Sequence, residues 1–281
     1  MNIQLFLLAS AIFFLALALV MAIRKDIEGK SHKLTAKENF ASLKDDFTNM
    51  IVHELRAPLI SIKDSSELIM SSKYNLVETE KKQFLEIINK QSRLLLDQIQ
   101  SILDSAKLEA GLFTIDRTKE DIGKLIKEQI GLFLPQATKK NIAITSHIPT
   151  NLPKILLDPM RMGQVMNNLL SNGLKFTPSG GRIDVLLEYA LSPLKSRNIT
   201  VRVKDTGIGI PKEDQKNLFG KFSQVNSSQQ LAKQGAGLGL YVIKGIIEAH
   251  GGTVSLESTP AKGTIVSFTL PLIDEQRQNK S

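Results

Sequence analysis

The spacing of side chains between residues 84 and 105 limits the folds open to this chain more than any other feature. Apolar or uncharged side chains recur there in alternating steps of four and three residues: Phe84, Ile88, Gln91, Leu95, Gln98, Ile102 and Ser105. This spacing is typical of the seam of a helix bundle. A first helix is expected to end near Ser71–Ser72, and Asn75 with Glu78 to cap the second. Such a hairpin buries too little apolar surface alone, so we expect two copies to form a dimeric four-helix bundle.

The first helix of this hairpin carries a histidine beside a carboxylate. It has an apolar stripe at helical spacing: Phe47, Met50, Ile51, Leu55, Pro58 and Leu59. His53 falls off this stripe, so it is expected to face solvent. Pro58 has no N–H for the carbonyl of Glu54, so the helix is expected to kink beside His53. These are the features of a nucleophile with an adjacent base, although an ordinary exposed histidine explains this stretch equally well.

The run from His53 to Leu59, His-Glu-Leu-Arg-Ala-Pro-Leu, resembles the phosphoacceptor motif of bacterial sensor histidine kinases. The resemblance extends from about Phe40 to Leu272 and implies a dimerisation and His-phosphoacceptor domain over residues 47–111, with Gly111 ending its second helix. His53 and Glu54 would be the catalytic residues. Val52 and Ala57 depart from the family pattern. Relatives that also dephosphorylate their regulator commonly have Thr or Asn at the position of Ala57, so we expect weak phosphatase activity.

The segment from Leu5 to Ile23 is apolar except for Ser10. Its 19 residues nearly match the hydrocarbon thickness of a bilayer, and the basic pair after Ile23 predicts that this end stays in the cytoplasm. We therefore expect a single-pass anchor over residues 1–23 in the cell (inner) membrane, with the kinase domains cytoplasmic. A cleaved signal peptide is the alternative, but residues 1–4 lack the charge that such a leader needs. Residues 24–46 read as a charged linker helix whose basic side chains could also contact anionic lipid head groups.

The composition excludes several kinds of chemistry. The net charge is +8, but no basic patch with interleaved aromatic residues accompanies it, so nucleic acid is not an expected partner. The chain has no cysteine, which rules out disulfides, zinc–thiolate sites and a cysteine nucleophile.

A mixed pattern of helices and strands begins at Leu112. Helices are predicted over residues 121–138, 161–174 and 241–250, and strands over 142–145, 182–189, 199–205, 253–258 and 264–270. Helices beside mostly antiparallel strands predict an α+β sandwich over residues 112–273. The remaining residues, 274–281, form a polar tail.

The predicted helix over residues 161–174 carries the first of three signals for a nucleotide site. Asn168, Asn172 and Lys175 are spaced so that one helix face, continued to Lys175, presents all three. Amide oxygens can bind Mg²⁺, which usually keeps water and substrate phosphates as its other ligands, and an ammonium group neutralises phosphate charge. A plain polar solvent face is the alternative.

The second signal is Asp205 at the end of a predicted strand. The strand's alternation places Asp205 on the same face as three apolar residues: Ile199, Val201 and Val203. A carboxylate that continues an apolar face needs a donor, and the exocyclic amino group of adenine would supply one. Gly207 and Gly209 let the backbone turn close to the base.

The third signal is a glycine-rich run, Gly235-Ala236-Gly237-Leu238-Gly239-Leu240, that opens a helix. Glycines at a helix N-terminus bring backbone N–H groups and a positive dipole to an anion. The run is not a Walker loop, because no Gly-Lys-Ser/Thr follows, and it does not follow a strand as a dinucleotide fingerprint would.

The three signals in this order resemble the ATP-binding (GHKL, or Bergerat) fold shared by histidine kinases, gyrase, Hsp90 and mismatch-repair ATPases. The resemblance implies that Asn172 is the Mg²⁺ ligand, with Asn168 and Lys175 near the phosphates, and that Asp205 reads adenine. The run from Gly235 to Leu240 would wrap the phosphates. Phe219 belongs to a segment, 218–222, that resembles the family's phenylalanine motif, and the polar stretch from Pro211 to Gly235 would be the ATP lid.

Together these resemblances imply a sensor histidine kinase of a two-component system. It would transfer a phosphoryl group from ATP–Mg²⁺ to His53, and then to an aspartate on the receiver domain of a separate response regulator. A membrane-tethered scaffold that only binds nucleotide, and an ATP-gated clamp that releases free phosphate, are the alternatives. The other three histidines, His32, His147 and His250, are expected at the surface or at a cap.

Overall fold

The computed structural model describes residues 52, 55–71, 76–190, 198–221, 223 and 237–272. His53, Glu54, Gly235, the linker 24–46 and the polar tail 274–281 lie outside these ranges, as does the predicted membrane segment. Within the described ranges, no helix combines the length and the apolarity that a bilayer crossing requires. The chain from Pro58 onward belongs to one compact unit, to which the contacts below belong.

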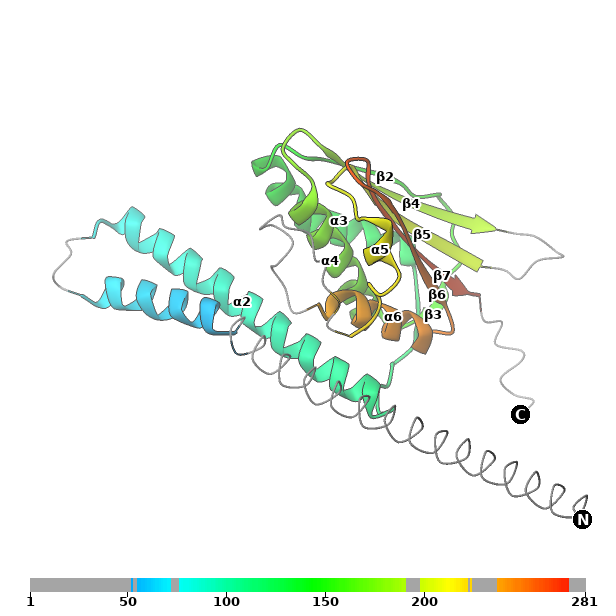
Figure 1. Ribbon diagram of the computed structural model, residues 1–281, viewed down its shortest axis with the longest axis horizontal. Helices are drawn as coiled ribbons and strands as arrows, with labels where there is room; N and C mark the ends of the chain where they lie inside the picture. Colours follow the sequence, from blue (N-terminus) through cyan, green and yellow to red (C-terminus); the bar gives the residue numbers. More distant parts are fainter. Residues whose placement is uncertain are drawn as a thin grey trace, which may run out of the picture. The chain divides into compact units, whose positions relative to one another are not determined.

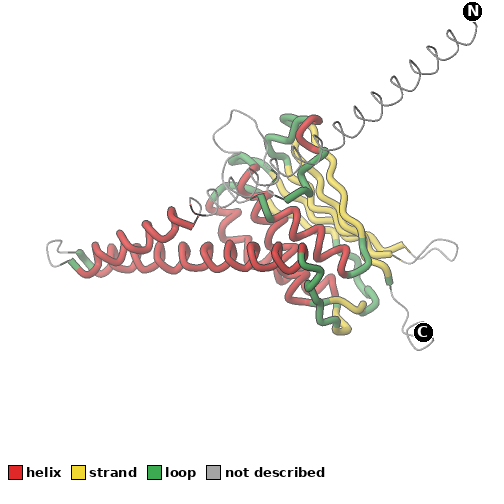
Figure 2. Tube along the Cα trace, turned by 60° about the horizontal axis from the view of Figure 1, so that its bottom comes forward, coloured by secondary structure: helices red, strands yellow, loops and turns green. Residues whose placement is uncertain are grey.

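A helical hairpin opens the described part of the chain. A helix spans residues 55–70, and its part from Pro58 onward lies beside the first half of α2, Glu78–Glu109 (Figures 1 and 2). The predicted cap at Asn75 is wrong: Val77 is the N-cap, and its N–H donates to the Glu80 carboxylate at 3.1 Å. The same side-chain-to-backbone arrangement was expected, but it forms two residues later.

The seam predicted along α2 is confirmed as its covered face. Ser105 is buried and the other six seam residues are half-buried, whereas a second row of large apolar side chains lies exposed: Leu85, Leu96, Ile99 and Leu103. Because exposed apolar rows at bundle spacing need a partner, the hairpin fits the predicted pairing of two copies.

The rest of the unit is an α+β sandwich, as predicted. Its main sheet has the order β2-β4-β5-β7-β6, formed by Ala143–His147, Arg182–Ala190, Asn198–Asp205, Gly263–Pro271 and Thr253–Thr259. All neighbouring strands are antiparallel except β2 and β4, which are parallel. A second, two-stranded sheet that was not predicted pairs β1, Thr118–Glu120, with β3, Ile155–Leu157.

Three helices cover one face of the main sheet: α3, Ile122–Lys139; α4, Pro159–Phe176; and α6, Gly239–Ala249 (Figures 1 and 2). Asp121 and Asp158 cap α3 and α4, each accepting the N–H three residues on at 3.0 Å. One further turn of helix, α5, spans Lys212–Gln215.

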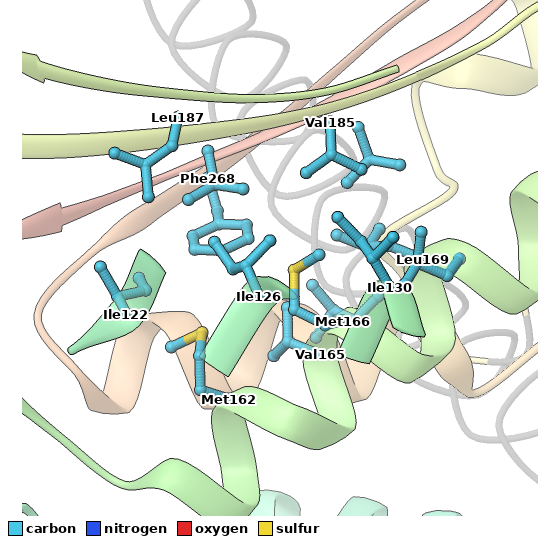
Figure 3. Packing of buried hydrophobic residues seen from close by; sticks show 14 of the residues in the cluster. Ile122, Ile126, Ile130, Met162, Val165, Met166, Leu169, Val185, Leu187 and Phe268 are labelled. Atoms are coloured by element: carbon cyan, nitrogen blue, oxygen red, sulfur yellow. The ribbon is translucent and has the colours of Figure 1, made fainter. Parts of the chain in front are cut away.

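The core lies between these helices and the sheet. Figure 3 shows Val185, Leu187 and Phe268 from the strands meeting side chains of α3 and α4, and all of these are buried. Strand residues alternate between this core and the other face. Because the core covers one face of each strand and helix, only the remaining faces can contact a ligand.

Candidate functional site

The first part of the site lies on the C-terminal half of α4. Asn168, Asn172 and Lys175 are all half-buried there, and the Nζ of Lys175 lies 4.8 Å from the ring centroid of Phe176. The buried residues of α4 face the core, so these three side chains occupy the side of the helix that stays partly open.

The second part is the carboxylate at the end of β5. Asp205 is half-buried, and its Oδ1 accepts the N–H of Gly207 at 2.8 Å and that of Thr264 at 3.2 Å. Burial raises the pKa of Asp205, whereas these two hydrogen bonds lower it. No described residue donates a hydrogen bond to Oδ2. One oxygen therefore fixes the side chain, and the other stays available to a donor on a ligand.

The turn after Asp205 lies directly against the end of α4. A Cβ on Gly207 would lie 2.6 Å from the carbonyl oxygen of Phe176, and Ile208 donates its N–H to that oxygen at 3.3 Å. Gly209 has φ of +68°, and a Cβ there would overlap the carbonyl of Thr259. Both glycines are thus required by close approaches, and the turn is held between α4 and the β6–β7 hairpin.

The third part, the start of α6, also meets α4. A Cβ on Gly239, the first residue of α6, would lie 3.7 Å from Oδ1 of Asn168. Leu238 is buried, so only its backbone can reach a ligand, and Leu240 packs against the core. Gly237 has φ of +63°. The structure therefore brings the described site residues close to one another: those of α4, the turn after Asp205 and the start of α6.

Phe219, a further residue predicted for the site, lies outside α4 and α6. Phe219 is half-buried in the turn after α5, beside the buried Leu218. A hollow of about 640 Å³ borders Asp205, Gly263 and Thr264, together with the side chains of Lys204, Lys212 and Lys262. No residue of α4 lines this hollow.

The side chains of this site could bind a magnesium ion only if a phosphate ligand supplied further oxygens. The described residues contain no group of three or more His, Asp, Glu or Cys side chains that could hold a metal by themselves. Asn172 offers a single neutral amide oxygen. Mg²⁺ is commonly bound with few protein ligands, its remaining positions being filled by water and substrate phosphates, which is the arrangement this site allows.

A buried ion pair joins α2 to α4. Asp104 is fully buried, and its two oxygens lie 2.9 and 2.8 Å from Nη1 of Arg161, which also stacks on Phe113 at 4.8 Å. Gln100 and Gln164 donate to the same carboxylate at 2.9 and 2.8 Å. No local sequence pattern indicates this cluster, because Asp104 and Arg161 are 57 residues apart.

His250 is the C-cap residue of α6, which confirms the capping role expected for it, and it is buried there. Its Nε2 accepts the N–H of Asp158 at 3.0 Å, and its Nδ1 lies 2.7 Å from the carbonyl of Ile246. Burial lowers the pKa of His250. His147, at the end of β2, is exposed as expected.

Comparison with known families places two matches on this chain. Residues 43–111 match the His Kinase A (phospho-acceptor) domain, and residues 157–274 match the histidine kinase-, DNA gyrase B-, and HSP90-like ATPase. The cell-division control histidine kinase PdhS of Brucella anthropi is 33% identical over 243 residues, and PdhS of Brucella canis is 32% identical over the same length. These alignments cover 83% of this chain but only 23% of each relative, so the chain spans about a quarter of their length.

Solved structures agree with the fold. Full-length ShkA in complex with AMPPNP has a TM-score of 0.58 at 25% identity, over 81% of this chain and 45% of that one. ThkA in complex with the response regulator protein TrrA has a TM-score of 0.57 at 26% identity, over 83% and 63%. AdeS of Acinetobacter baumannii, at 20% identity and a TM-score of 0.56, shares the fold.

Proposed function

Because this chain belongs to the histidine kinases of two-component systems, we propose that it transfers the γ-phosphoryl group of ATP to His53 and then to an aspartate of a separate response regulator. One observation carries the proposal. The asparagines of α4, the Asp205 turn and the start of α6 converge, in a chain whose preceding hairpin matches the phosphoacceptor family.

ATP binding follows from the chemistry of these groups. The free Oδ2 of Asp205 would accept the exocyclic N–H of adenine, while Oδ1 is held by Gly207 and Thr264. The N-terminal N–H groups of α6, with the ammonium of Lys175 and the amide of Asn168, would bind the phosphates. Asn172 would hold Mg²⁺, which neutralises phosphate charge when bound.

The transfer step uses the neutral imidazole of His53. A ring nitrogen would attack the γ-phosphorus, forming a P–N bond as the bond to the ADP oxygen breaks, and Glu54 would accept the ring proton. Catalysis then consists mainly of positioning and charge neutralisation. In a second step, a receiver aspartate would take the phosphoryl group and leave the histidine free.

The proposal includes an assembly and a location. Two copies would pair through the hairpin (residues 47–111), covering the exposed row that contains Leu96 and Leu103. Leu5–Ile23 would anchor the chain in the cell (inner) membrane, with residues 24–46 leading to the hairpin and residues 112–273 binding ATP in the cytoplasm. The structure of ThkA bound to TrrA supports a regulator as the partner.

Incubating the 281-residue chain in detergent with γ-labelled ATP and a panel of receiver domains tests this function. We expect an acid-labile, base-stable label on the protein that moves to a receiver domain. Release of free phosphate with no labelled protein would favour an ATP-gated clamp. Nucleotide binding with neither product would favour a scaffold.

Phosphatase activity is expected to be weak. Ala57 is exposed on the helix over residues 55–70 and comes four residues after His53 in the sequence. Its methyl group cannot orient a water for attack on a phosphoryl aspartate. The measurement is loss of label from a phosphorylated receiver domain, with and without ADP. The Ala57→Asn variant, which has an amide at this position, is expected to dephosphorylate the receiver domain faster than the unmodified chain does. Rapid ADP-stimulated loss with the unmodified chain would refute the prediction.

A further inference from the structure

The protonation state of His250 is fixed by its two neighbours. The Ile246 carbonyl can only accept, so Nδ1 must carry the proton, and Nε2 is then free to accept the N–H of Asp158. The ring is neutral and only 3% exposed. Protonation would put a second donor on Nε2, facing the Asp158 donor.

Asp158 connects this imidazole to the start of α4. Its Oδ1 accepts the N–H of Arg161 at 3.0 Å and caps the helix, and its Oδ2 accepts the N–H of Asp116 at 2.9 Å. From the same side, Arg117 donates to the carbonyl of Ala249 at 2.8 Å. The last turn of α6 is therefore joined to the first turn of α4 through His250.

The same two helices meet again at the nucleotide site. Asp158 lies ten residues before Asn168 on α4, and His250 lies eleven residues after Gly239 on α6, so both spans are about 15–17 Å long at helical rise. Asn168 and Gly239 lie side by side, as do Asp158 and His250. The two helices are thus antiparallel. They contact each other at two places about 15–17 Å apart, namely at these two residue pairs.

We propose that His250 is a positioning residue of the nucleotide site. Its neutral ring holds α6 against α4, so that the N–H groups at the start of α6 and the amides of α4 address the same phosphate chain. This inference rests on the proposed binding of ATP by these helices. His250 lies at the opposite end of α6 from the phosphates, so it acts only through the helix pair.

The arrangement predicts a pH dependence. The charged groups that face the ring are Arg117 and Asp158: burial, followed by Arg117, lowers the pKa of His250, whereas the Ile246 carbonyl and Asp158 raise it. Because the folded chain holds the ring neutral, its contribution is complete above the unfolded value of about 6.5. Stability is expected to fall as the pH drops below that value, because the unfolded chain then takes up a proton that the folded chain does not. ATP affinity is expected to fall only at a lower pH, where the ring of the folded chain becomes protonated as well.

The test compares His250→Leu and His250→Gln in the 281-residue chain, with ATP–Mg²⁺ as the probe. The leucine leaves the Asp158 N–H buried without an acceptor, and ATP affinity at pH 7.5 is expected to fall about tenfold, with a raised KM for ATP and a kcat within about twofold. The glutamine can place an acceptor near the position of Nε2 but cannot titrate. It is expected to keep affinity within about threefold at pH 7.5 and to lack the fall in affinity that protonation of His250 causes in the unmodified chain at acid pH. The same changes at the exposed His147 serve as matched controls and should have no effect.

Two results would overturn the inference. One is native affinity in the leucine variant, and the other is an acid dependence in the glutamine variant equal to that of the unmodified chain. If the leucine variant does not fold, the pH profile of the glutamine variant decides. Failure of the unmodified chain to bind ATP would instead overturn the proposed function, and this inference with it.

Discussion

Asp205→Asn is expected to weaken ATP binding by about 10- to 150-fold, because one charge-assisted hydrogen bond to adenine is lost. The asparagine keeps an oxygen for the N–H groups of Gly207 and Thr264, which hold the native carboxylate. Its NH₂ group then stands where Oδ2 faced the base, so two donors meet. The loss of ATP affinity should therefore reflect weaker recognition of the base, while the fold stays intact.

The comparison nucleotide is ITP, which has a carbonyl oxygen in place of the adenine amino group. The unmodified chain should prefer ATP strongly, and the variant should have a reduced or reversed preference. Titration calorimetry of both nucleotides measures this, with Asp64→Asn on the exposed face of the first helix as the control for loss of a charge. An unchanged ratio of ATP to ITP affinity would show that Asp205 does not read the base.

Asp104→Ala is expected to lower the free energy of unfolding by about 3–5 kcal/mol, because it leaves the guanidinium of Arg161 largely buried without a counter-charge. In a unit of this size, that corresponds to a melting temperature lower by about 6–20 °C. Removing the carboxylate also deprives Gln100 and Gln164 of their acceptor.

The neighbouring ion pair between Glu109 and Lys221 provides the matched control. It is shorter, at 2.6 Å, but the Glu109 side chain is 53% exposed, so Glu109→Ala should cost less than about 1 kcal/mol. The double variant Asp104→Leu/Arg161→Met should recover most of the lost stability. Equal costs at Asp104 and Glu109 would show that burial does not set the strength of these pairs.

The sheet could be predicted because its strands bury one face only. Alternation of Ile199, Val201 and Val203 predicted β5 and placed Asp205 on the inner face. The two strands that were missed, β1 and β3, have three residues each, too few for a pattern of period two. The parallel pairing of β2 with β4 was also not predicted, because strand order depends on contacts far apart in the sequence.

The site could be predicted where its residues lie close together in sequence, and not where they are distant. Asn168 and Asn172 share a helix face by their spacing alone, but no local pattern joins Asp104 to Arg161. His250 did carry a usable signal: it follows Ile243 and Ile246 at steps of three and four, which places it on the buried stripe of α6. A polar residue that continues an apolar stripe deserves a search for its partner.

The most direct test of the central claim is labelling of His53→Ala by γ-labelled ATP, with the ATP affinity of the same protein measured in parallel. We expect native affinity together with complete loss of the acid-labile, base-stable label in this variant, and native labelling of His147→Ala. Label that persists in the His53 variant would contradict transfer of the phosphoryl group from this nucleotide site to that imidazole.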